Sequence, residues 1–277
     1  MVLRVGTVPF LVARPLTEGL AADPQVRLTF APPAQLAVGL ETGALDVALA
    51  SAEVCAQVRG PSDPRFRLWE EGPVIASRGA VRSVLLFLRP GLCGPSRIET
   101  LAPDPHSRTG RALARILLHE AYAADFAELA ADPGADPFQS GADAVQLIGD
   151  RALDAVIEQP AWTVVDLGET WHRLTRLPFV YAGWIGREGF DPADAADRLR
   201  PAAERGLAAR PALIDEGVRE HAYDRSFLDR YLNQDVVYHL SVDELRATLQ
   251  EFGLRLARSG VTSRTASESG NRLAPGG

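Results

Sequence analysis

Short apolar runs alternate with amphipathic stretches in the first part of the chain. Residues 2–7, 26–31 and 45–50 are apolar runs of strand length, and residues 15–20 and 34–42 carry apolar side chains at helical spacing. Strands and helices that alternate in this way with short connections are typical of a parallel sheet covered by helices. The first part of the chain is therefore predicted to be an α/β unit.

A second α/β unit follows, and then a helical C-terminal part. The pattern predicts strands at 81–88, 126–129, 153–158 and 162–166. It predicts a helix at 111–121 and a loop at 130–141, and residues 144–148 fit either a helix or a strand. Residues 179–184 predict a strand that returns to the first unit. Helical spacing then predicts helices at 191–209, 211–221, 224–233 and 241–257, the last opened by a capping box of Ser241 and Glu244.

One α/β unit interrupted by another predicts two lobes. The first lobe comprises residues 1–87 and 182–258, the second comprises 88–181, and 259–277 form a flexible tail without hydrophobic periodicity. The chain crosses between the lobes near Leu86–Arg89 and near Phe179–Ala182, which we expect to be hinge strands. The cleft between two hinged lobes is where a ligand binds.

Composition and motif content argue against several kinds of partner. The 277 residues carry a formal net charge of −7, with 29 basic residues and 36 acidic ones, which argues against a nucleic-acid partner. No apolar run reaches the length of a membrane span and no signal-peptide pattern opens the chain, so we expect a cytoplasmic protein with no membrane partner. Cys55 and Cys93 lack partners at metal-ligand spacing, so we expect no metal site and two buried thiols.

The turns that follow predicted strands carry the candidate binding residues. Ser107, Arg108, Thr109 and Gly110 stand before a predicted helix, whose free N–H groups and partial positive charge suit a carboxylate. A plain helix cap would use the same residue types. Ser51 ends an apolar strand and raises the same two possibilities.

Three further side chains are candidates for contact with a ligand. Ser83 lies inside an apolar strand, and a buried hydroxyl needs a partner, either backbone or ligand. Arg14 is able to pair with a second carboxylate or to stand in solvent as a surface arginine. Glu53 and Asp150 are possible bases, although no catalytic triad or phosphate loop occurs. An enzyme of this kind would depend on positioning its substrate.

Several blocks together resemble one family. They are Val5–Leu11 before Pro15-Leu16, Leu45–Leu49 with Ser51, Val81–Val84, Ser107–Thr109, Leu147–Leu153, Asp166–Gly168 with Trp171, Leu177–Ala182 with Trp184, and Tyr231–Asn233. The chain is similar over residues 2–257 to the chorismate dehydratase family of the futalosine route to menaquinone.

The resemblance implies a periplasmic-binding-protein-like α/β fold of type 2, with two three-layer αβα lobes joined by two hinge strands. It implies a hydro-lyase without a cofactor that converts chorismate to 3-[(1-carboxyvinyl)oxy]benzoate and water. In this interpretation Ser107, Thr109 and the N–H of Gly110 hold one carboxylate, and Ser83 hydrogen-bonds the substrate near the leaving hydroxyl or a carboxylate. Tyr181 belongs to the pocket, and a carboxylate of the substrate itself acts as the base.

One position departs from the family pattern. Val12 stands where the family has a cleft asparagine, and valine neither donates nor accepts a hydrogen bond. Val12 is therefore expected only as a wall residue of the pocket. Either a neighbour such as Arg14 or Thr7 takes the place of the amide, or the reaction is slowed, or the ligand differs. Two other functions stand as alternatives: a binding protein for a small carboxylate on the same scaffold, which Val12 supports, and the sister enzyme that acts on cyclic dehypoxanthine futalosine.

Overall fold

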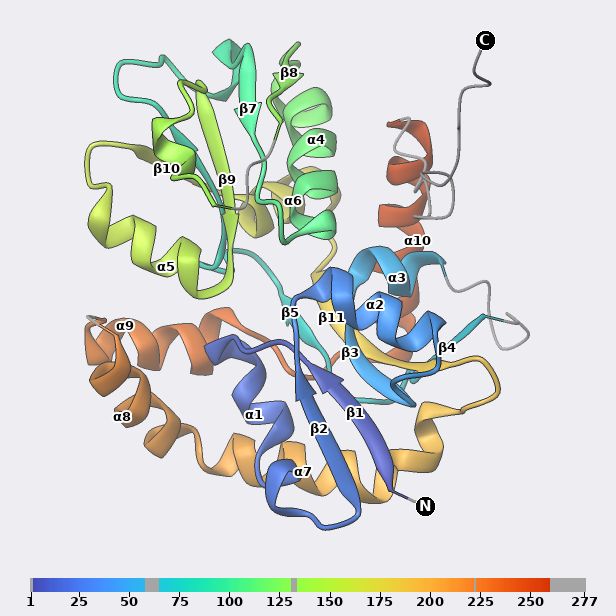
Figure 1. Cartoon of the computed structure of the whole chain (residues 1–277). Coiled ribbons are helices and arrows are strands. Elements are labelled where there is room, and N and C mark those ends of the chain that lie inside the picture. Colours follow the sequence, from blue (N-terminus) through green and yellow to red (C-terminus); the bar gives the residue numbers. More distant parts are fainter. Residues whose placement is uncertain (1, 58–64, 131–133, 222, 260–277) are drawn as a thin grey trace, which may run out of the picture.

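The computed structural model describes residues 2–57, 65–130, 134–221 and 223–259. Its strands form two sheets, one in each of two lobes, and helices cover both sheets (Figure 1). The predicted flexible tail lies outside the described residues from residue 260 onward.

The first sheet joins the start of the chain to a strand from its second half. Its order is β2-β1-β3-β11-β4, with β5 also paired to β11. The strand bounds are β1 Leu3–Thr7, β2 Val26–Phe30, β3 Val47–Ser51, β4 Phe66–Leu68, β5 Ile75–Ser77 and β11 Phe179–Arg187. β1 runs parallel to β2 and β3, whereas β11 runs antiparallel to β3 with Ala182 opposite Ser51. The carboxyl ends of β1 and β3 therefore lie together at one edge of the sheet.

Helices from both ends of the chain surround the first sheet (Figure 1). They are α1 Arg14–Thr17, α2 Pro33–Glu41, α3 Ala52–Gln57, α7 Ala196–Ala208, α8 Arg210–Glu220, α9 Arg225–Arg230 and α10 Val242–Arg258. A π-helical turn, Tyr231–Asp235, continues α9. The predicted capping box is confirmed, because Ser241 and Glu244 exchange both of its hydrogen bonds at the start of α10.

The second sheet is built from the middle of the chain. Its order is β10-β6-β9-β7-β8, with bounds β6 Val84–Leu88, β7 Thr100–Ala102, β8 Ala127–Glu128, β9 Ala144–Ile148 and β10 Thr163–Asp166. Its helices are α4 Arg108–Tyr122, α5 Gly149–Glu158 and α6 Leu167–Thr175. Alternate residues of β6 join two different hydrophobic clusters, one shared with α4 and α6 and the other shared with α5. Because successive side chains of a strand point to opposite faces, this sheet is the middle layer of an αβα sandwich.

The chain crosses between the sheets at places other than those predicted. β6 pairs with β9 and β10 in the second sheet, so the first crossing lies between Ser77 and Val84, before the predicted Leu86–Arg89. Phe179–Ala182 lies in β11 of the first sheet, so the second crossing lies between α6 and Phe179. Both predicted hinge strands are buried sheet strands. Their apolar patterning continues to the strand end, so hydrophobicity alone does not mark where a lobe begins.

Two predicted elements are wrong in type or length. Residues 153–158 are the second half of α5 and not a strand. Leu153 and Ala155 are buried while Val156 and Ile157 are 40% and 49% exposed, so this apolar run covers more than one face of a helix. The helix predicted at 15–20 ends at Thr17, because Gly19 adopts a left-handed φ of 76° that breaks it.

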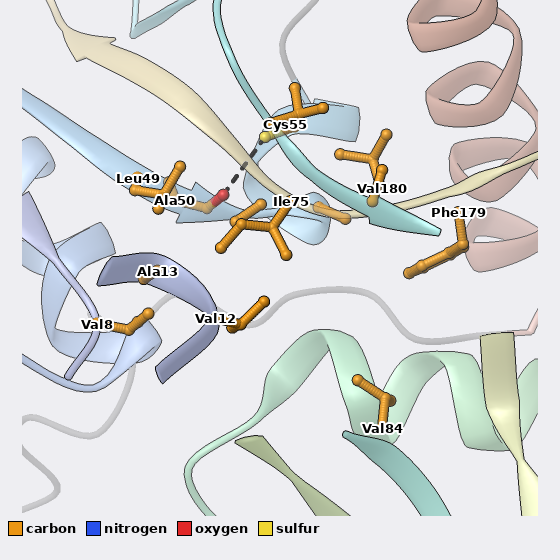
Figure 2. Packing of buried hydrophobic residues seen from close by; sticks show 14 of the residues in the cluster. Val8, Val12, Ala13, Leu49, Ala50, Cys55, Ile75, Val84, Phe179 and Val180 are labelled. Atoms are coloured by element: carbon orange, nitrogen blue, oxygen red, sulfur yellow. Dashed lines mark hydrogen bonds between the residues drawn. The ribbon is translucent and has the colours of Figure 1, made fainter. Parts of the chain in front are cut away.

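The two cysteines occupy different surroundings. Cys55 is 2% exposed, its thiol donates to the carbonyl of Ala50 at 3.6 Å (Figure 2), and burial raises its pKa to about 12. Cys93 is exposed in the turn between Gly91 and Gly94, so its predicted burial is wrong. No helix among the described residues is long and apolar enough to cross a membrane.

Candidate functional site

A cavity lies where the two sheets meet, with a volume of about 670 Å³ including its open mouth. Its lining residues come from eight separate segments of the chain: Val8, Phe10, Val12, Pro33, Leu49, Ser51, Ile75, Val81, Ser83, Val84, Ser107, Thr109, Gly110, Ile148, Gly149, Tyr181 and Ala182. The carboxyl ends of β1, β3 and β9 open into it, as expected for ligand sites in α/β sheets.

The start of α4 contributes a helix N-terminus to the cavity. Ser107 is the N-cap residue, and its hydroxyl oxygen accepts the N–H of Gly110 at 2.9 Å. The N–H of Gly110 is therefore occupied, which differs from its expected role as a carboxylate donor. The N–H groups of Arg108 and Thr109 have no partner among the described residues and remain available.

Close packing explains why position 110 is a glycine. A Cβ atom at this position would approach Gln146 Nε2 to 2.6 Å, Ser107 Oγ to 2.7 Å and Ile148 Cγ2 to 2.8 Å. All three neighbours belong to the second lobe and lie behind the helix start. The glycine therefore lets α4 pack against β9.

Thr109 and Arg108 connect the second lobe to the first. Thr109 Oγ1 accepts the backbone N–H of Glu53 at 3.0 Å, at the start of α3. The Arg108 guanidinium donates to the Glu53 carboxylate at 2.7 Å. Thr109 lines the cavity, whereas Arg108 does not and instead pairs with a carboxylate whose side chain is only 4% exposed. Glu53 is thereby engaged in a contact between the lobes.

Ser83 lies at the end of the first crossing and faces the cavity. It is 3% exposed, and its hydroxyl oxygen accepts the O–H of Tyr231 at 2.8 Å. Its carbonyl accepts the N–H of Gly149 at 2.7 Å, while the preceding N–H groups of Val81 and Arg82 donate to the Asp166 carboxylate. The position of Ser83 is therefore fixed from several sides.

Tyr181 and Ser51 supply the remaining hydroxyls. Tyr181 Oη lies 3.0 Å from Ser77 Oγ, and Ser77 donates to the carbonyl of Gly79 at 2.8 Å. Because Ser77 has given its proton to Gly79, Tyr181 is the donor to Ser77 and offers only acceptor capacity to the cavity. Ser51 lies at the end of β3, and its side chain has no hydrogen-bond partner among the described residues.

The first lobe gives the cavity an apolar side. Val12 is 6% exposed in a short 3₁₀ turn, and its carbonyl accepts the O–H of Tyr238 at 3.1 Å. Figure 2 shows the side chains of Val12, Ile75 and Val84 reaching toward one another from three separate segments. Val12 thus lines the cavity as a wall residue and adds hydrocarbon to it.

Arg14 does not reach the cavity. Its guanidinium pairs with Glu220 at 2.5 Å and with Glu216 at 3.8 Å, both on α8. Arg14 follows the buried turn of Leu11, Val12 and Ala13. Its pairing with a second carboxylate of a ligand stays a prediction.

Phe10 and Gly149 are cavity residues that the sequence did not single out. Gly149 has a φ of 62°, and a Cβ there would meet the Phe10 ring at 2.9 Å. Phe10 therefore packs directly on the Gly149 backbone across the interface between the lobes. The next residue, Asp150, accepts the N–H of Leu11, and burial raises its pKa. The glycine in the Leu-Ile-Gly-Asp block was the available signal, since a conformation of this kind favours glycine.

The cavity is uncharged but offers directed donors. None of the described residues that line it carries a charge, and neither Glu53 nor Asp150 is among them. Ser83, Ser107 and Thr109 each accept a hydrogen bond from the protein, so each keeps its own O–H proton for a ligand. Such an arrangement suits an anionic acceptor group. Among the described residues no group of three or more His, Cys, Asp or Glu side chains is placed to hold a metal ion.

Comparison with known sequences finds one family and a related enzyme. A model of the family described as menaquinone biosynthesis matches residues 3–257. A chorismate dehydratase of Thermus thermophilus is 32% identical over 202 residues, which cover 66% of this chain and 72% of that protein.

Comparison with solved structures identifies the fold. A protein of Archaeoglobus fulgidus superposes with a TM-score of 0.69 at 15% identity, covering 94% of this chain and 98% of that chain. The periplasmic aliphatic sulphonate binding protein of Escherichia coli gives 0.62 at 13% identity, covering 99% and 96%. A Candida albicans protein said to have the generic periplasmic binding protein fold gives 0.59 at 11% identity, covering 96% and 92%. The predicted periplasmic-binding-protein-like fold is confirmed.

Proposed function

The chain belongs to the menaquinone biosynthesis family, and from this membership we propose that it is a chorismate dehydratase, a hydro-lyase that needs no cofactor. The observation that carries the proposal is the set of three hydroxyls, Ser83, Ser107 and Thr109, whose protons point to no protein acceptor and which share one enclosed cavity. Chorismate brings two carboxylates and a ring hydroxyl, which are acceptors for such protons.

The reaction requires little chemistry from the protein. The bond from the ring carbon to its hydroxyl breaks, the neighbouring ring carbon that carries the enolpyruvyl ether loses its proton, and the two leave together as water. The product ring is aromatic, so the reaction is strongly driven. An enzyme for this step has to hold a reactive conformer and stabilise the departing hydroxyl and the anionic groups.

The start of α4 suits one carboxylate of the substrate. The hydroxyls of Ser107 and Thr109 and the free N–H groups of Arg108 and Thr109 converge there, and the helix dipole favours negative charge. In this proposal the backbone of Arg108 binds substrate while its side chain stays paired with Glu53. Gly110 contributes shape only, because its N–H serves Ser107.

Ser83 is proposed as the catalytic residue. Its O–H donates to the leaving hydroxyl or to a carboxylate near it, which lowers the cost of the negative charge that develops as the bond breaks. The two carboxylates once considered as bases are engaged elsewhere, Glu53 with Arg108 and Asp150 with the N–H of Leu11. A carboxylate of the substrate itself is therefore the proposed base.

Val12 supports a second candidate, a binding protein for a small carboxylate on the same scaffold. The hydrocarbon at this position removes a polar contact that the related family has, without blocking access to the donors of the opposite wall. A protein with this cavity would bind chorismate without turning it over.

The test is incubation of the purified protein with chorismate, followed by chromatography and absorbance for 3-[(1-carboxyvinyl)oxy]benzoate. Product formation that depends on enzyme concentration supports the dehydratase. Binding of chorismate in calorimetry without product supports the binding protein. If the protein neither binds nor converts chorismate but turns over cyclic dehypoxanthine futalosine in a parallel assay, it is the sister enzyme.

A further inference from the structure

The hydroxyl of Ser83 has one partner in the described protein, and that partner comes from far along the chain. Tyr231 donates to Ser83 Oγ at 2.8 Å across a separation of 148 residues, and both side chains are buried. The Tyr231 ring is fully enclosed, with 0% exposure, and stacks near Phe227 at a centroid distance of 6.2 Å. Its hydroxyl therefore has a fixed direction.

The direction of this hydrogen bond decides what Ser83 offers to a ligand. A hydroxyl has one proton and two lone pairs, so a serine that accepts from tyrosine keeps its own proton free. Burial raises the pKa of Tyr231 above its ordinary value, so the phenol keeps the proton that it donates. Without this donor the serine proton would be free to turn toward other acceptors.

The fold holds Tyr231 in place through the same segment that carries Ser83. Tyr231 opens a π-helical turn, a rare element that is frequent at functional sites. At the end of that turn Asp235 accepts a hydrogen bond from Arg82 Nε at 3.1 Å. Arg82 adopts a left-handed φ of 66°, a strained conformation for a residue other than glycine, directly before Ser83. Strain of this kind persists only where surrounding contacts maintain it.

We propose that Tyr231 is a positioning residue for the reaction: it occupies a lone pair of Ser83 and thereby directs the serine proton into the cavity. The inference rests on the proposed function, in which Ser83 donates to the substrate. Tyr231 does not line the cavity and acts only through Ser83. Its removal is thus expected to change catalysis more than the affinity for substrate.

The experiment is Tyr231→Phe, alone and combined with Ser83→Ala. For chorismate dehydration we expect Tyr231→Phe to lower kcat about tenfold with KM changed less than about threefold, since one oriented donor is lost from the transition state. The Kd of the product, which does not react further, is measured for all four proteins. We expect Tyr231→Phe to lower kcat in the wild-type background and to have no effect on kcat once Ser83 is alanine, while the product affinity, measured without the leaving hydroxyl, changes less than kcat.

Tyr122→Phe is the matched control, because the Tyr122 hydroxyl bonds to Thr170 away from the cavity. It should leave kcat and Kd unchanged. An equal loss of kcat from Tyr231→Phe in both Ser83 backgrounds would overturn the proposal, since the tyrosine would then act independently of the serine. Thermal melting of each variant establishes that it is folded.

A crystal structure of the Tyr231→Phe variant separates this inference from the proposed function. We expect Ser83 to occupy more than one rotamer, or a rotamer that differs from the wild type. If the wild type neither binds the product nor dehydrates chorismate, the proposed function is wrong while the rotamer still decides the positioning role. A single unchanged Ser83 rotamer would sink the inference.

Discussion

The two walls of the cavity use similar secondary structure but differ in the polar groups that they offer a ligand. The wall of the first sheet presents mainly hydrocarbon, with the hydroxyls of Ser51 and Tyr181 at the ends of its strands; its apolar residues are Val8, Phe10, Val12, Leu49 and Ile75. The opposite wall presents Ser83 from the first crossing together with Ser107 and Thr109 at the start of α4. Each of these three hydroxyls has its oxygen engaged by a protein donor and its proton available.

The difference in polarity between the two walls follows from the connection that leads into each helix. α4 has 15 residues, a serine cap and an N-terminus directed at the cavity, so its free N–H groups face a ligand. After β1 the chain enters a 3₁₀ turn of buried Leu11, Val12 and Ala13 with no side-chain cap, and α1 has only four residues. A polar wall thus arises where a long capped helix starts, and an apolar wall where the turn is itself part of the core.

Removing the central donor of the polar wall should have the largest effect. Ser83→Ala is expected to lower kcat for chorismate dehydration by about 100-fold, because one directed donor is lost at the developing negative charge. Steady-state kinetics measure the loss, and Ser96→Ala, an exposed serine outside the cavity, is the control. Full activity of Ser83→Ala would remove Ser83 from the mechanism.

Adding a polar group to the wall of the first sheet should increase activity. Val12→Asn restores the residue type of the related family, and we expect kcat/KM to rise about tenfold, a contribution typical of one added hydrogen bond to a charged group. Val12→Ala serves as control, since it opens similar space without a polar atom. If Val12→Asn is folded and no more active than Val12→Ala, the apolar wall is not what limits the reaction.

Breaking the contact between the two walls should have a smaller effect. Thr109→Val removes a donor to the substrate and leaves the N–H of buried Glu53 unpaired, which should lower the free energy of unfolding by about 1–3 kcal/mol and raise KM severalfold. Thr109→Ser keeps the hydroxyl and should remain close to wild type. Chemical denaturation and kinetics are measured on both. Equal stability of the valine and serine variants would contradict the assigned contact.

Arg14→Ala should have the smallest effect on catalysis. The guanidinium pairs with Glu216 and Glu220 on α8, outside the cavity, and exposed ion pairs of this kind contribute little stability. We expect kcat and KM to change less than about twofold. A KM raised tenfold or more would show that Arg14 turns toward the substrate in the complex and that the charge-free cavity is incomplete.

Much of the site was predictable because its signals are local. A serine before a long amphipathic helix predicts a cap, and a cap at the end of an α/β connection predicts a place at the ligand edge of the sheet. Local logic does not reveal that the long side chain of Arg14 pairs with acidic residues about 200 positions away on α8. It failed for α5, because the apolar run that suggested a strand covers two faces of a helix.

The sequence by itself determined the strands near 2–7, 26–31 and 45–50, the helix near 34–42 and the capped start of α4, since periodicity and capping act over a few neighbouring residues. Only the tertiary structure decided where the chain crosses between sheets and which partners the hydroxyls take. Tyr231 meets Ser83 and Glu53 meets Thr109 across separations of 148 and 56 residues. Such pairs depend on how distant elements pack, and no local pattern encodes that geometry.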